Sequence, residues 1–162
     1  MPAGALYFAY GSNMDVEQMA RRCPAARLVG AAVTDGFRFA IDRRWVAALE
    51  TRVGSQAYGL LWRVTPACLT ALDEWEGVAR GCYRRAAITC RQWPEAQEEA
   101  CAVEALTYLS CWEGKPSHRK EGYLERILAA AARAGLPPDY VEAQIAPFER
   151  LPTRRRDQAP AL

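Results

Sequence analysis

Three acidic side chains within one short segment form the part of this 162-residue chain best suited to proton transfer. They are Asp73, Glu74 and Glu76, and Glu76 comes just before Gly77, where a helix is expected to end. A glutamate at such a break can project over a pocket, where loss of hydration favours the protonated carboxyl and raises its pKa toward neutrality. Such a group can act as a general base and then return the proton as an acid.

The same acids also fit other roles. Asp73 lies three residues before Glu76 on the same helical side, so it is either a rival for the proton-transfer role or a group that supports Glu76. All three acids could instead form a solvated helix end, because runs of charge usually lie on hydrated faces. Apolar neighbours at Trp75 and Val78 are what would desolvate Glu76 in a pocket.

A second segment, residues 7–13, could bind an anion through its backbone. Residues 5–10 carry no charge and predict a strand buried on both faces. Gly11 can adopt positive φ and bring the backbone close to a ligand. Ser12 and Asn13 are good caps for a helix over residues 15–22, and Asp15 can complete a capping box. Unpaired N–H groups at such a turn suit a carboxylate or an oxyanion, although a tight turn that binds nothing has the same pattern.

Other kinds of chemistry find little support in the sequence. The single histidine, His118, lies in a polar segment and is expected at the surface, which disfavours Ser/His or Cys/His catalysis. The six cysteines show no C-x-x-C spacing, so we expect no metal site and mostly reduced, packed thiols. No P-loop and no G-x-G-x-x-G motif is present, so we expect no nucleotide cofactor.

Length, charge and hydropathy limit the classes of partner. A chain of 162 residues is long enough for one domain with a real core. A net charge of +2 is too small to indicate binding to nucleic acid or to an anionic membrane. No apolar run has membrane-spanning length and no secretory signal is visible, which predicts a cytoplasmic protein.

The elements that must position these residues are short strands and a few helices. We expect helices over residues 15–22, 67–75 after the Thr65-Pro66 start, 139–145, and a long one that Ser117 caps and Gly135 ends. Strands are expected over residues 27–34, 36–42, 45–49, 57–64, 83–92 and 100–110, with turns or loops at 35–36, 53–56 and 94–99. The sum is a single mixed α/β (α+β) domain over residues 1–150, followed by a flexible basic tail over 151–162.

Several segments together closely resemble the γ-glutamylcyclotransferase family, including its AIG2-like and BtrG-like members. Two motifs carry the resemblance: residues 7–13, and residues 72–78 with Tyr83 beyond them. Further landmarks are residues 57–62, Ser117, Tyr123, Ile127 and residues 135–140. The match spans nearly the whole chain apart from the arginine tail.

This resemblance implies a small mixed β-barrel with flanking helices, acting on a small-molecule γ-glutamyl amide without metal or cofactor. The free α-amine of the substrate attacks its own γ-carbonyl, which yields 5-oxoproline and releases the amine or amino acid. Glu76 is then the acid/base, and a homodimer is a possible assembly. The residues that the resemblance assigns to the substrate pocket are Tyr7, Phe8, Ala9, Tyr10, Gly11, Ser12, Tyr123 and, as a weaker candidate, Tyr83.

Two positions depart from the family pattern, and the leaving group stays open. Trp75 is bulkier than the usual residue before the glutamate, and residues 130–131 are Ala-Ala where Gly-Ala is common. The leaving group could be an amino acid, an amine or an aminoglycoside-type chain, whereas the continuation after residue 12 makes glutathione a poor first choice. Acids at Glu95, Glu98 and Glu99 would favour a cationic acceptor if they reached the pocket, but a solvated hairpin is the simpler interpretation. The alternative function is a noncatalytic small-molecule binding module.

Overall fold

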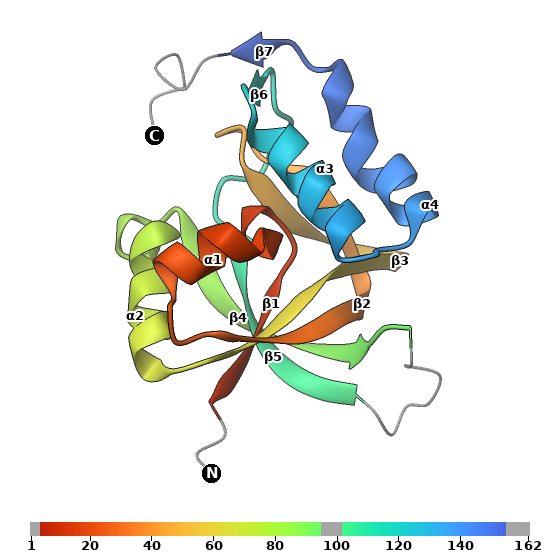
Figure 1. Ribbon diagram of the computed structural model, residues 1–162. Helices are drawn as coiled ribbons and strands as arrows, with labels where there is room; N and C mark the ends of the chain where they lie inside the picture. Colours follow the sequence, from red (N-terminus) through yellow and green to blue (C-terminus); the bar gives the residue numbers. More distant parts are fainter. Residues whose placement is uncertain (1–3, 95–101, 155–162) are drawn as a thin grey trace.

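A closed five-stranded barrel forms the centre of the computed structural model, which describes residues 4–94 and 102–154 (Figure 1). The strand order around the barrel is β1-β3-β2-β4-β5. Neighbouring strands are antiparallel except β1 and β5, which run parallel and close the barrel at Tyr7 and Leu106. The mixed barrel with flanking helices that the sequence analysis predicted is therefore confirmed.

The elements of the described residues have the following bounds. The barrel strands are β1 Ala5–Ala9, β2 Arg27–Ile41, β3 Ala47–Val64, β4 Tyr83–Gln92 and β5 Ala102–Ser110. The helices are α1 Val16–Arg22, α2 Pro66–Trp75, α3 Tyr123–Arg133 and α4 Pro138–Tyr140, which continues as a π-turn over Val141–Ile145 and a 3-10 turn over Ala146–Arg150. Further 3-10 turns span Ser12–Met14 and Val78–Arg80, and β6 Arg119–Lys120 pairs with β7 Thr153–Arg154.

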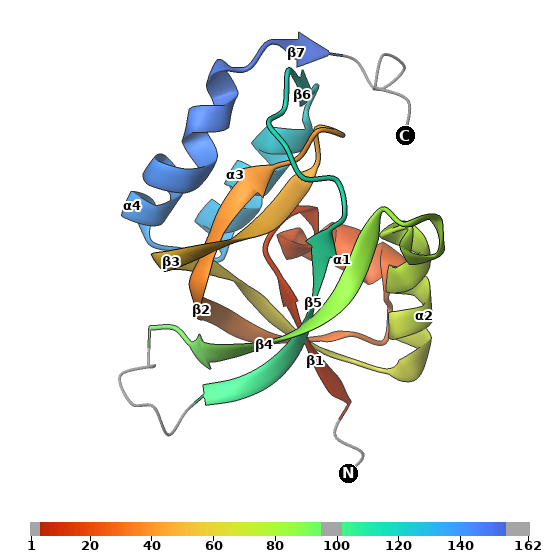
Figure 2. The same ribbon diagram turned by 180° about the vertical axis from the view of Figure 1, so that it is seen from behind.

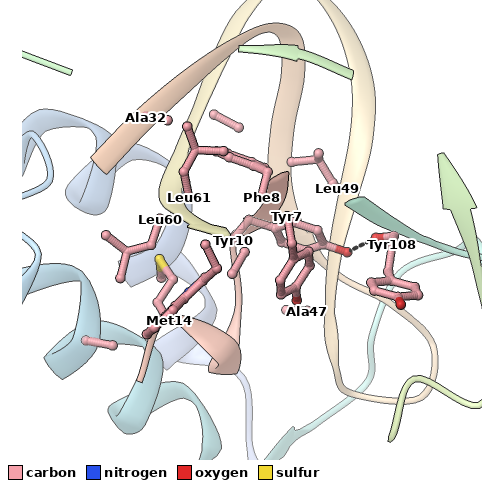
Figure 3. Close-up of a cluster of buried hydrophobic side chains, with 14 of the residues drawn as sticks. Tyr7, Phe8, Tyr10, Met14, Ala32, Ala47, Leu49, Leu60, Leu61 and Tyr108 are labelled. Atoms are coloured by element: carbon pink, nitrogen blue, oxygen red, sulfur yellow. Dashed lines mark hydrogen bonds between the residues drawn. The ribbon is translucent and has the colours of Figure 1, made fainter. Parts of the chain in front are cut away.

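The strand β1 runs through the core only in its second half. Ala5 is exposed, whereas Tyr7, Phe8 and Ala9 are buried. Figure 3 shows the cluster around them, in which the hydroxyl of Tyr10 donates to the carbonyl of Tyr108 at 2.5 Å. The uncharged strand β1 is therefore anchored in the barrel core, and the turn that follows it begins at the end of this buried segment.

Strands β2 and β3 form one long bent ribbon, which corrects two expectations. Turns were predicted at residues 35–36 and 53–56, but the chain reverses only over residues 42–46. The register jumps from Asp35 opposite Gln56 to Phe37 opposite Thr51, so Gly36 faces four residues of β3 across a bulge. Positive φ at Gly36 and Gly54 lets both strands bend without ending. The ribbon thus extends past the barrel beneath α3 and α4 (Figure 2).

Two helix starts also differ from the expectation. Asp15, not Ser12 or Asn13, caps α1, because its carboxylate accepts hydrogen bonds from the backbone N–H groups of residues 17 and 18. The helix α3 begins after Gly122, which has φ of 75°, and Ser117 does not cap it. The intervening residues form β6 instead, and Thr153–Arg154 of the expected tail pair with it, while residues 155–162 lie outside the described part.

No helix among the described residues is long and apolar enough to cross a membrane.

Candidate active site

A cavity of about 430 Å³ opens where the end of β1, the turn after it and the end of α2 meet. The hairpin turn between β2 and β3 and the first turn of α3 complete its wall. Its lining residues are Tyr7, Tyr10, Gly11, Ser12, Asn13, Gln18, Arg22, Arg44, Val46, Ala47, Trp75, Glu76, Arg80, Cys82, Tyr83, Lys120, Tyr123 and Arg126. The cavity therefore joins aromatic hydroxyls, several cations and a single carboxylate.

Glu76 reaches the cavity because α2 ends directly at it. The hydroxyl of Thr65 caps the start of α2, and buried Leu72 anchors the helix in the core. Glu76 is the C-cap, with its N–H bonded to the carbonyl of Leu72 at 2.8 Å, and Gly77 then reverses the backbone with φ of 63°. A Cβ at Gly77 would also lie 3.0 Å from Cys82, so glycine suits both the left-handed turn and the tight packing.

Burial gives this carboxyl a pKa near neutrality. Loss of hydration raises the pKa of Glu76 to about 7, and the positive charges of Arg22 and Arg44 act in the opposite direction. Burial also raises the pKa of Tyr123 to about 12 and keeps the pKa of Tyr83 well above its ordinary value. At neutral pH, Glu76 can therefore take up or release a proton, while these tyrosines stay protonated and act as hydrogen-bonding groups.

Asn13 orients Glu76 and was not predicted as a site residue. Its buried side-chain amide donates to the Tyr7 hydroxyl at 3.0 Å and to Oε1 of Glu76 at 3.3 Å. Its carbonyl oxygen accepts from Gln18 at 3.0 Å and from Arg22 at 2.9 Å, which fixes which way the amide faces. The sequence carries a signal for it, since Asn13 ends the segment that bears the resemblance, but the residue type alone predicts only a helix cap.

Gly11 is required by space rather than by its backbone angle. Its φ is −118°, so the expected positive φ is wrong. A Cβ at this position would lie 2.8 Å from the Cβ of Ala47. Ala47 is itself fixed, because its N–H donates to the hydroxyl of Tyr123 at 3.0 Å and its carbonyl accepts from the hydroxyl of Tyr83 at 2.5 Å. The turn after β1 and the start of β3 thus approach each other closely at the cavity floor.

Arg44 brings a buried positive charge into the cavity wall. Its side chain is 8% exposed and forms a salt bridge at 2.6 Å with Asp42, which is 2% exposed. Asp42 also accepts from Ser110 at 2.5 Å, and the guanidinium of Arg44 lies 4.5 Å from the ring centre of Tyr83. The intervening turn is strained at Trp45, which has φ of 67°. Sequence reasoning missed this arginine.

Seven of the nine predicted site residues meet in the cavity: Glu76, Tyr7, Tyr10, Gly11, Ser12, Tyr83 and Tyr123. The other two do not line it. Phe8 is 0% exposed and Ala9 is 1% exposed, and both pack in the barrel core. Because alternate residues of a strand face opposite sides, Phe8 points away from the side to which Tyr7 contributes.

The other candidates lie outside the reacting region or at its edge. Asp73 is bound by Arg85 at 2.6 Å and by the hydroxyl of Tyr108 at 2.7 Å, so it does not share the cavity with Glu76. Trp75 is 60% exposed and lies at the cavity edge with Arg22 stacked on its ring at 4.3 Å. Val78 does not line the cavity, and His118 packs beside Trp45, with 5.5 Å between the ring centres.

Within residues 4–94 and 102–154, no group of three or more His, Cys, Asp or Glu side chains is arranged to hold a metal ion. The five described cysteines are free thiols, and all but Cys111 are buried. Cys101 and the acidic residues Glu95, Glu98 and Glu99 lie outside the described residues.

Comparisons with known proteins agree with this architecture. The model of the AIG2-like family matches residues 56–143, which is more than half of the chain. The chain is 29% identical to gamma-glutamylcyclotransferase of Mus musculus over 147 residues, covering 85% of this chain and 75% of the mouse protein. For the Homo sapiens gamma-glutamylcyclotransferase the identity is 28% over 147 residues, with the same coverage of 85% and 75%.

A solved structure of a gamma-glutamyl cyclotransferase superposes with a TM-score of 0.76 at 23% identity, covering 98% of this chain and 92% of the other. At this identity the likeness shows the fold. Together with the family model, it confirms the resemblance found in the sequence. The chain belongs to the AIG2-like family and has the fold of the γ-glutamyl cyclotransferases.

Proposed function

We propose that the protein is a γ-glutamylcyclotransferase that converts a γ-glutamyl amide to 5-oxoproline and a free amine or amino acid. The observation that carries the proposal is the setting of Glu76, whose carboxyl has a pKa of about 7. It accepts a hydrogen bond from the side-chain amide of Asn13 in a cavity that tyrosine side chains also line. A solvated helix end would leave this pKa near its ordinary value. The relatives named gamma-glutamylcyclotransferase support the same reaction.

The proposed reaction needs one proton acceptor that later becomes a donor. The carboxylate of Glu76 removes a proton from the substrate α-ammonium group, and the amine lone pair attacks the γ-carbonyl carbon to close a five-membered ring. The carbonyl electrons move to oxygen in a tetrahedral intermediate, which the N–H groups of Gly11 and Ser12 stabilise. As the C–N bond of the amide breaks, the acid form of Glu76 protonates the leaving nitrogen. The ring nitrogen then gives up its second proton, which passes by way of the Glu76 carboxylate to the released amine, so that 5-oxoproline and an ammonium group are formed.

Shape and charge of the cavity suit this intramolecular step. The rate of ring closure is raised most by holding the glutamyl chain bent, with its amine and carbonyl in contact. The close approach of Gly11 to Ala47 narrows the cavity where this chain would lie. The buried guanidinium of Arg44 offers a fixed partner for the glutamyl α-carboxylate. The hydroxyl of Tyr123 supplies a further hydrogen bond in the same wall.

A binding module without turnover is the second candidate function. It would use the same tyrosines and arginines but has no need for a carboxyl whose pKa lies near neutrality, so the observed setting of Glu76 favours the enzyme.

The deciding experiment is mass-spectrometric detection of 5-oxoproline. The protein would be incubated with γ-glutamyl-alanine, ε-(γ-glutamyl)-lysine, glutathione and a γ-glutamyl amine, each beside the variant Glu76→Gln. We expect release from at least one compound and a loss of about two to four powers of ten in the variant. Binding of these compounds without any release would favour the module, and equal release by both proteins would refute the role of Glu76.

A further inference from the structure

Four cations line the cavity and form what we call the basic rim, defined as Arg22, Arg80, Lys120 and Arg126. All four line the cavity that contains Glu76. They come from separate elements: α1, the 3-10 turn after α2, β6 and α3. The positive charge of the cavity is therefore contributed by four separate elements of the fold.

Neighbouring acids offset only part of this charge. Arg126 lies 3.8 Å from Asp15, and its guanidinium also donates to Gln18 at 3.0 Å. Arg22 donates to the uncharged amide oxygen of Asn13, and within the described residues neither Arg22 nor Arg80 forms a salt bridge. Arg44, deeper in the wall, is paired with buried Asp42, and in the proposed reaction it holds the glutamyl α-carboxylate and not the outer end of the substrate.

This arrangement implies a substrate with negative charge at its outer end. Inside a cavity, charges of one sign focus the electrostatic field, so a group of cations attracts an anion more strongly there than on an open surface. A polyamine or aminoglycoside leaving group would have to place its ammonium groups among these cations, which costs free energy. A leaving group with a single carboxylate would engage only some of these cations.

We propose that the leaving group is an acidic amino acid, so that the substrate is a γ-glutamyl compound with two carboxylates beyond the scissile amide. The inference rests on the proposed function, in which the glutamyl half of the substrate occupies the tyrosine-lined end beside Glu76. The two outer carboxylates then bind to the rim, one toward Arg22 and Arg126 and the other toward Arg80. The rim sets specificity, and none of its cations gives or takes the transferred proton; Arg22 also acts on the pKa of Glu76 through its charge.

Equilibrium binding separates this inference from catalysis. The variant Glu76→Gln would be titrated calorimetrically with γ-glutamyl-glutamate, γ-glutamyl-glutamine and γ-glutamyl-lysine linked through its α-amine, which have similar lengths and differ in outer charge. We expect the glutamate compound to bind about 5- to 10-fold more tightly than the glutamine compound, with the lysine compound weakest. Raising the salt to about 0.5 M should reduce these ratios.

Charge-neutral rim variants test whether the rim causes the preference. In the same background, Arg80→Gln should lower the preference for glutamate over glutamine by about 2- to 4-fold. The matched control is Arg84→Gln, which removes an exposed arginine that does not line the cavity and should leave the preference unchanged. Equal affinity for the glutamate and glutamine compounds, tightest binding of the lysine compound, or an unchanged preference in Arg80→Gln would each overturn the inference.

Turnover by the unmodified protein distinguishes the two proposals. Release of 5-oxoproline at equal kcat/KM from the glutamate and glutamine compounds would overturn the acidic leaving group and leave the cyclotransferase reaction in place. No release from any of the three, with the expected order of binding, would overturn the reaction while the charge preference of the rim stands.

Discussion

Replacing Glu76 with glutamine should stabilise the protein at alkaline pH while it abolishes most of the activity. The pKa of this carboxyl is about 7 in the folded protein, against an ordinary value of 4.5. The folded state therefore holds the proton more tightly than the unfolded chain. This costs stability once the group must ionise: the cost is small below the ordinary pKa, grows as the pH rises, and is complete above the folded-state pKa. Glutamine has the same shape and no charge, so it avoids the cost.

The magnitude follows from the pKa difference. Each pKa unit corresponds to about 1.36 kcal/mol, so the full cost at pH 8 is about 3 kcal/mol. The carboxyl faces a cavity that water can enter, and we therefore expect Glu76→Gln to gain about 1–2 kcal/mol at pH 8 and much less at about pH 5. The amide oxygen of the glutamine can still accept the hydrogen bond from Asn13. Turnover should fall by about two to four powers of ten.

Urea unfolding at both pH values, with 5-oxoproline release measured on the same preparations, provides the assay. The matched control is Asp73→Asn, three residues earlier on α2. Hydrogen bonds from Arg85 and Tyr108 lower the pKa of Asp73, so its removal should cost stability at pH 8, and this loss should fade as the pH falls through its folded-state pKa. A variant Glu76→Gln that is no more stable than the native protein at pH 8, or equally stabilised at both pH values, would refute the reasoning.

Three further substitutions test other parts of the site. Gly11→Val should destabilise by about 1–3 kcal/mol and weaken substrate binding, because even its Cβ would lie 2.8 Å from Ala47; normal affinity in a well-folded variant would contradict this. Asp42→Asn should lower the free energy of unfolding, measured by heat or urea, by about 3 kcal/mol, because it leaves Arg44 without its buried partner. The control Glu50→Gln removes one partner of the more exposed pair with Arg38 and should lower it by less than about 1 kcal/mol. Asn13→Ala removes a donor to the ionised form of Glu76, so the pH at which kcat/KM rises should move to a more alkaline value.

The position of Glu76, the proposed proton-transfer group, could be predicted from the sequence because it depends on local signals. Thr65-Pro66 starts α2, and Gly77 ends it one residue after Glu76, so neighbours along the chain decide where the side chain emerges. The barrel class could be predicted from the resemblance alone, because the strand pattern by itself predicts only a mixed α/β domain. That class alone does not determine how far each strand extends.

What the sequence could not show depends on contacts between distant segments. Gly36 and Gly54 lie in segments where turns were expected, and both have positive φ. Whether the chain reverses there depends on the pairing of β2 with β3, and the two residues lie in the same bulge. Arg44 enters the cavity because Asp42 is held by Ser110, 68 residues away in the chain. Neither partner is distinguishable from an ordinary surface residue by type or spacing.

Arg22 links the charge of the cavity to its chemistry. Burial raises the pKa of Glu76, and the field of Arg22 opposes that effect, so the balance between the two leaves the carboxyl near neutrality. Arg22→Gln removes the opposing charge and should move the rise of kcat/KM with pH to more alkaline values, with a greater loss of activity at pH 7 than at pH 9. Arg22→Lys keeps the charge and should restore most of the native profile, although it lacks the planar group that stacks on Trp75. If Arg22→Gln lowered activity equally at every pH, Arg22 would act only by holding Asn13 in place, and the pKa of Glu76 would depend on burial without it.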